Sequence, residues 1–162
     1  VSASTNHVEI ACNTTSVTID GTWANLGNTA KSSLVTGGRI RIPSGLTEVK
    51  YADNTFPFSA LIEGKRHFEL DLEMAVSSAA ITEYDAWVAG TSRAIQLQFT
   101  GPVIEGSLKY YLLVQIYGKY TSPPTIFGSR DGEDLISMTL SSFDDGSGNE
   151  FSLALQNKET AL

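Results

Sequence analysis

Apolar and polar residues alternate along most of this chain, which is typical of half-buried β-strands. The longest such stretch has apolar residues at Phe68, Leu70, Leu72, Met74 and Val76. The intervening positions are polar, namely His67, Glu69, Asp71 and Glu73. A slip of one residue in strand register would turn such an apolar face outwards, so the pattern specifies strand pairing strongly.

The same alternation predicts several further strands. Their apolar positions are Ile95, Leu97 and Phe99; Tyr110, Leu112, Val114 and Ile116; Ile136, Met138 and Leu140; and Phe151, Leu153 and Leu155. Shorter pieces follow the same rule around residues 17–19 and 40–42, and at residues 7–12, where Val8, Ile10 and Cys12 share one face. Turn residues predict a connection over residues 101–106 and a flexible hairpin end at residues 144–149.

One helix is predicted over about residues 78–90. Its apolar residues fall at helical spacing: Ala80, Ile81, Tyr84, Trp87 and Val88. Ser78 is expected to cap its N-terminus and Gly90 to end it. The fold class predicted for residues 1–162 is therefore a single, mainly β domain: a two-sheet β-sandwich or partly open barrel with one packed helix.

Two segments lack clear periodicity, residues 21–38 and residues 43–57. Both are longer than ordinary connections, and long ordered loops in compact domains tend to carry partner contacts. We therefore expect residues 43–57 to form a long loop that carries a function or a partner contact.

Composition narrows the range of functions. The chain has 162 residues and a formal net charge of −7, which argues against direct binding of nucleic-acid phosphates. The single cysteine, Cys12, excludes an intrachain disulfide and a thiolate metal cluster. No apolar run approaches the roughly 20 residues that cross a bilayer. The sequence starts at Val1 and not at Met, which leaves open a processed product or a segment of a longer polypeptide.

Residues that could carry chemistry are few. Neither histidine belongs to a metal-spacing motif, and no phosphate loop or nucleophile elbow is present. His67, Glu69, Asp71 and Glu73 share one strand face, but a solvated face or channel wall explains them better than catalysis or metal binding. We therefore expect no enzyme activity, no cofactor and no metal. On the polar face of another strand, Tyr111 and Tyr117 are candidates for a subunit contact.

The order of these segments resembles a known family. A stretch at residues 58–66 ends in Gly-Lys-Arg and leads into the strand at residues 68–74. The helix containing Tyr84 and Trp87 and a Gly90-Thr91 turn follow, then the strand at residues 110–117 and a closing segment at residues 151–157. Over residues 36–162 this order is similar to that of the tail-tube proteins of long-tailed phages, especially the C-terminal half of the longer members.

The resemblance implies a structural virion protein that assembles with copies of itself into rings, six-membered in that family. The rings stack into a tube that contacts other tail proteins and conducts DNA without binding it specifically. By analogy with long loops in that family, the loop at residues 43–57 is the candidate contact between rings or neighbouring subunits. It also implies a location in the virion tail, reached from the host cytoplasm, with no membrane. Six copies would carry a formal charge of −42. We expect Glu69, Asp71 and Glu73 to face the lumen, where acidic groups repel DNA over about 8 Å at physiological salt.

Three alternatives remain open at this stage. A carbohydrate- or receptor-binding β-sandwich would gather exposed aromatic side chains on one surface. An enzyme on a β scaffold would gather His67 and several carboxylates in a pocket. The tube of a contractile secretion system would share the fold, and the sequence separates it poorly from a phage tube.

Overall fold

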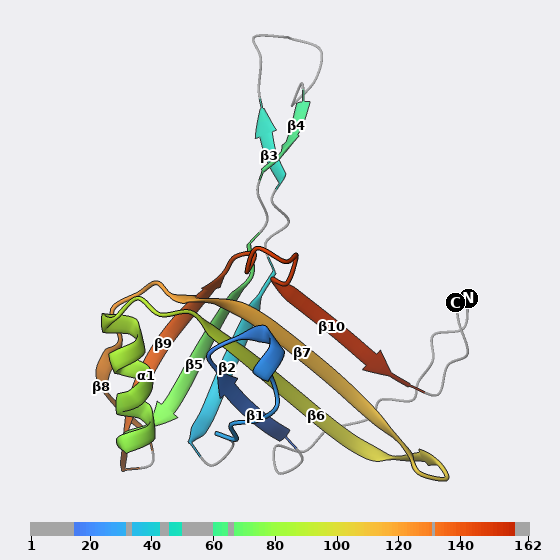
Figure 1. The fold of residues 1–162 in the computed structure, drawn as a ribbon, viewed down its shortest axis with the longest axis horizontal. Helices are drawn as coiled ribbons and strands as arrows, with labels where there is room; N and C mark the ends of the chain where they lie inside the picture. The colour runs from blue at the N-terminus through green and yellow to red at the C-terminus, as the bar shows by residue number, and fades with distance from the viewer. Residues whose placement is uncertain are drawn as a thin grey trace.

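The computed structural model describes residues 15–31, 34–42, 46–49, 60–64, 67–130 and 132–157. Within them lie ten strands, one α-helix and one short 3₁₀ helix (Figure 1). The first part of the chain contributes β1 (Thr15–Asp20), η2 (Trp23–Asn25), β2 (Val35–Arg41), β3 (Leu46–Val49), β4 (Ala60–Glu63) and β5 (Glu69–Ala75). The helix α1 (Ser78–Val88) is followed by β6 (Arg93–Glu105), β7 (Leu108–Tyr120), β8 (Thr125–Arg130), β9 (Glu133–Ser142) and β10 (Phe151–Gln156).

Eight of the strands form one antiparallel sheet, with the order β1-β6-β7-β9-β5-β2. The sheet branches, because β10 also pairs with β7 and β8 also pairs with β9. The strands β3 and β4 pair only with each other in the described residues. The prediction of a mainly β fold with one helix is confirmed. The large sheet is not closed into a barrel, and the expected two-sheet sandwich is not confirmed.

The branch in the sheet depends on a glycine. On one side β7 pairs with β10 over Tyr111–Ile116 and with β9 over Gly118–Tyr120. A Cβ atom at Gly118 would overlap the backbone carbonyl of Ser141 in β9. Since only glycine lacks that atom, Gly118 permits the close approach that transfers β7 from one neighbour to the other.

The core lies on one face of this sheet, beneath α1. Its fully buried large side chains are Leu70, Leu72, Met74, Ile95, Ile116 and Leu140. They belong to the alternating apolar positions expected from the sequence, so the predicted inward face is confirmed for β5, β6, β7 and β9. Val76 does not join them, because β5 ends at Ala75 and leaves the Val76 side chain 46% exposed.

The helix is confirmed, but its cap and its buried face differ from the prediction. Ser77, and not Ser78, is the N-cap, and its side chain accepts a hydrogen bond from the Ala80 backbone N–H. The buried residues are Ala80, Glu83 and Ala86, whereas Ile81 and Val88 are 50% and 63% exposed. Small alanines let the helix approach the sheet closely, which turns the larger apolar residues to its flanks.

A buried charge holds the helix to the sheet. The Glu83 carboxylate accepts a 2.7 Å hydrogen bond from Arg93 Nε on β6 and a 3.3 Å bond from the Tyr120 hydroxyl on β7. Lys31 Nζ lies 3.9 Å from Oε1, the other carboxylate oxygen of Glu83. Burial, and then the Glu83 charge, raise the pKa of Tyr120 well above its ordinary value. An unpaired buried carboxylate would destabilise the core, but one with an ion pair and hydrogen bonds is tolerated there.

Several connections also differ from the sequence predictions. The strands β6 and β7 continue through the expected turn at residues 101–106 and meet at a two-residue connection, Gly106-Ser107. The nonperiodic residues 21–38 include η2 and the start of β2. The expected loop at residues 43–57 contains β3, and its other residues lie outside the described part of the chain, as do residues 7–12.

The connection at residues 144–149 is neither a hairpin end nor loosely held. Asp144 Oδ1 accepts hydrogen bonds from the backbone N–H groups of Gly146 and Gly148. Asp145 accepts three more, from Ser147 and from the backbone and side chain of Asn149, and these hydrogen bonds hold its pKa below the ordinary value. The strands it joins, β9 and β10, pair with β7 and not with each other.

Candidate assembly surface

Four strands of the large sheet have a paired neighbour on one side only within the described residues. These are β1, β2, β8 and β10. The outer side of β1 is partly covered, because Lys31 N donates to Val17 O and Ile19 N donates to Thr29 O. The strands β2, β8 and β10 therefore present unpaired main chain to a further strand along one side, and such edges readily pair with another chain.

Apolar rows run across the sheet and end on β10. Directly paired residues share one face of a sheet, so the pairing places Val17, Leu97, Val114 and Leu153 in one row. The first three are 3–7% exposed, but Leu153 is 57% exposed. Leu155 ends the next row and is 67% exposed.

The predicted alternation of β10 is thus confirmed, but its expected burial is wrong. On the apolar face of β10, only Phe151 at the start of the strand is covered, by a ring stack on Phe68 with centroids 4.0 Å apart. The core face of the sheet continues onto β10 beyond the reach of α1 and β2, and β10 lies at the margin of the molecule (Figure 1). We call Leu153 and Leu155 the open margin.

Two hairpins extend from the body of the sheet. The pair β3–β4 projects away from it (Figure 1) and joins it through the segments that follow Arg41 and precede Phe68. The ends of β6 and β7 form the second, and its side chains Val103 and Leu108 are 54% and 57% exposed. Two-stranded hairpins are marginally stable alone in water, so both are suited to contacts with another molecule.

The acidic residues predicted to line a lumen do share one face of β5. Glu69, Asp71 and Glu73 are half-buried there and point away from the core. Arg41 on the neighbouring β2 lies 3.3 Å from Glu69 and donates to both oxygens of Asp71, at 2.8 and 2.9 Å. Arg39 is paired directly with Asp71 in the β2–β5 register. Two of the three carboxylates are therefore offset by arginines, which the sequence pattern did not reveal.

Asp71 is the best-held carboxylate of this face. Partial burial tends to raise its pKa, but hydrogen bonds from Thr139 and Arg41 outweigh burial and hold the pKa below its ordinary value. His67 Nε2 lies 3.7 Å from Glu69, at the edge of the same cluster. No group of three or more His, Cys, Asp or Glu side chains suited to a metal ion occurs among the described residues.

The two tyrosines predicted to contact a neighbour, Tyr111 and Tyr117, are both half-buried on β7. The Tyr117 ring packs edge-on against Phe143, with centroids 5.2 Å apart. Tyr111 is paired with Gln156 of β10, beside the open margin. On the helix, the ring of Trp87 packs against the ring of Tyr84, with centroids 5.6 Å apart. These ring contacts account for Tyr117 and Trp87 within one molecule and leave Tyr111 as the better-placed contact residue.

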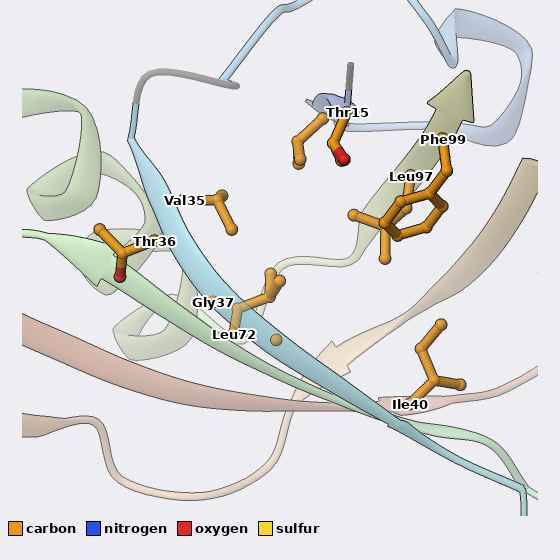
Figure 2. Close-up of a pocket in the computed structure, with 10 residues that line it drawn as sticks. Thr15, Val35, Thr36, Gly37, Ile40, Leu72, Leu97 and Phe99 are labelled. Carbon is orange, nitrogen blue, oxygen red and sulfur yellow. The ribbon is translucent and has the colours of Figure 1, made fainter. Parts of the chain in front are cut away.

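An apolar cleft of about 420 Å³ lies on the core face between β1 and β2 (Figure 2). Leu97 and Phe99 line one side with Thr15 and Val17, and Leu72 lies at its base. The other side is formed by β2, from Val35 to Ile40. This cleft could not be predicted from the residue pattern, because it arises where two strands far apart in the strand order come to face each other.

No family model matches this chain, and no curated protein matches it. No helix in the described part of the chain is long and apolar enough to span a membrane.

Proposed function

We propose that this chain is a structural subunit that assembles with copies of itself through the edges of its sheet. The observation that carries the proposal is the open margin, where the apolar face of the core runs out to the 57% and 67% exposed Leu153 and Leu155 on an edge strand. An apolar surface next to unpaired main-chain groups is the chemistry that a further strand satisfies.

A contact between unlike edges of the sheet would build a ring, where a contact between like edges would build a simple pair. The strands β10 and β2 are different edges of one sheet, so a contact between β10 of one copy and β2 of the next joins two unlike surfaces. Such a heterologous contact forms a closed ring when the rotation closes. The hairpin β3–β4, which projects from the sheet, is suited to reach a copy in the next ring.

Together with the resemblance in segment order, this supports a tail-tube subunit of a long-tailed phage. Rings of this chain, hexameric by that resemblance, would stack into a tube that conducts DNA within the virion tail. Glu69, Asp71 and Glu73 remain the candidate lumen residues, although Arg39 and Arg41 make that face less repulsive to DNA than three carboxylates alone.

Electron microscopy of the purified protein over a range of high concentrations tests this proposal. We expect rings, or tubes built from stacked rings. A particle that stays monomeric at every concentration would contradict the proposal, and an assembled structure with Glu69, Asp71 and Glu73 on the outside would refute the lumen assignment alone.

A further inference from the structure

The cleft between β1 and β2 is an unfilled part of the core face. Gly38 of β2 is paired with Leu72 of β5 and contributes no side chain to the space beside it. Leu72 at the base of the cleft is 1% exposed, whereas Ile40 and Phe99 on its two sides are half-buried. The cleft therefore has apolar walls around space that close packing would fill.

The size and shape of the cleft suit a row of apolar side chains. An apolar cavity of about 150 Å³ holds one benzene molecule, so a cleft of about 420 Å³ has room for two leucine side chains, which are smaller than benzene. One wall is β2 itself, from Val35 to Ile40 (Figure 2). Because β5 pairs with the other side of β2, a strand added at the cleft would satisfy the free edge of β2 while its alternate side chains enter the cleft.

The open margin of a second copy matches this space. Leu153 and Leu155 are two residues apart on one face of β10. Gly38 and Ile40 are likewise two residues apart on the core face of β2, since both are paired with buried leucines of β5. With β10 of one copy alongside β2 of the next, one leucine lies opposite Ile40 and the other lies opposite Gly38, where the missing side chain leaves room for it.

Charge favours this contact over a pair of like edges. The polar face of β2 carries Arg39 and Arg41, so two copies of β2 side by side would bring these arginines together. The strand β10 has no charged residue from Phe151 to Gln156. A pair of β10 strands would cover the leucines but would leave the cleft open.

We propose that, in the assembled protein, Leu153 and Leu155 of one copy fill the cleft of the next, opposite Gly38 and Ile40. This inference rests on the proposed self-assembly and specifies its contact, in which each copy completes the core of its neighbour. Since every copy has both a β10 and a cleft, the contact repeats from copy to copy.

Disulfide trapping tests which side chains meet. Cys12, the only cysteine of the chain, is replaced by serine in every variant, and Ile40→Cys is combined in turn with Leu153→Cys, Leu155→Cys or Ala154→Cys. A disulfide requires Cα atoms about 4.4–6.8 Å apart and Cβ atoms directed at each other. After oxidation of the assembled protein, we expect a ladder of covalent multimers from Leu155→Cys if the two strands are parallel, or from Leu153→Cys if they are antiparallel. The control, Ala154→Cys, lies on the opposite face of β10 and should give only monomers on a non-reducing gel.

An exchange of side-chain size tests the cleft itself. A Cβ atom at Gly38 would lie 3.1 Å from the Asp71 carbonyl oxygen, so Gly38→Val requires a shift of a few tenths of an ångström and then occupies the cleft. It should raise the concentration needed for assembly by about 5- to 140-fold, the factor that corresponds to overpacking a contact. Leu153→Ala or Leu155→Ala, whichever removes the opposing side chain, should restore assembly in this background, although the same truncation weakens assembly of the wild type. A variant that merely folded poorly would not be rescued in this way.

The outcomes separate this inference from the proposed function. Assembly without a disulfide at either leucine position, or with equal trapping of Ala154→Cys, would overturn the cleft contact and leave self-assembly standing. Failure of both leucine truncations to restore assembly of Gly38→Val would overturn it as well. A wild-type protein that stays monomeric at every concentration would contradict the proposed function, and this inference with it.

Discussion

Replacing both leucines of the open margin with serine should weaken self-assembly while leaving the fold of one molecule intact. In the isolated molecule Leu153 and Leu155 are more exposed than buried, at 57% and 67%. Substitutions at such surface positions usually change the free energy of unfolding by no more than about 0.5 kcal/mol. Their cost should therefore appear in association and not in folding.

The size of the effect follows from the exposed fractions. Full burial of a leucine side chain contributes about 1.5–3 kcal/mol. With about 60% of each side chain left to bury, a contact between copies would gain roughly 1–2 kcal/mol from each leucine. The double variant should lose about 2–4 kcal/mol per contact, which corresponds to a roughly 30- to 700-fold weaker association at 1.4 kcal/mol per factor of ten.

Sedimentation velocity over a concentration series measures this shift, and urea unfolding checks the fold. Val88→Ser is the matched control, because Val88 is 63% exposed but lies on α1 and not on β10 or β2. The reasoning is refuted if the double variant assembles at the same concentration as the wild type. It is also refuted if Val88→Ser weakens assembly equally.

Three further predictions concern stability. Glu83→Ala should lower the free energy of unfolding by about 3–5 kcal/mol, because it leaves Arg93 without its buried partner; a loss under about 1 kcal/mol in urea unfolding would contradict the role of Glu83. Gly118→Ala should destabilise the protein and increase amide hydrogen exchange where β7 meets β9, since the added Cβ overlaps the Ser141 carbonyl; unchanged exchange would show that the branch tolerates a side chain. Because the folded-state pKa of Asp71 is depressed, its ionised form stabilises the fold above the ordinary carboxyl pKa, and this contribution disappears as the pH falls through the depressed value. Melting temperatures from pH 7 to pH 2 should thus fall less in Asp71→Asn than in the wild type, and parallel profiles would argue against this linkage.

The strands of the core could be predicted from the sequence because burial on one face imposes a period of two. Leu70, Leu72 and Met74 on β5 are buried as their alternation indicates. The same period occurs in β10, where Leu153 and Leu155 are exposed. Periodicity reports which side chains share a face, and it does not report whether another element covers that face.

The features that the sequence did not reveal depend on tertiary neighbours. Glu83 reads as a polar helix residue, yet it is 2% exposed because Arg93 lies beside it. Its spacing of three residues from both Ala80 and Ala86 is the one local sign that it shares their face. Similarly, the polar face of β5 is uniformly acidic in the sequence, and only the pairing of β5 with β2 places Arg41 beside its carboxylates. Neither contact can be found without the fold.

Amide hydrogen exchange, compared between dilute and assembled protein, tests most directly whether sister molecules complete the sheet. In β10, alternate N–H groups point towards β7, and the others point away from it. We predict that assembly slows exchange at the outward set in β10 and at the outer edge of β2. Assembly that leaves the exchange of both edges unchanged would contradict the account.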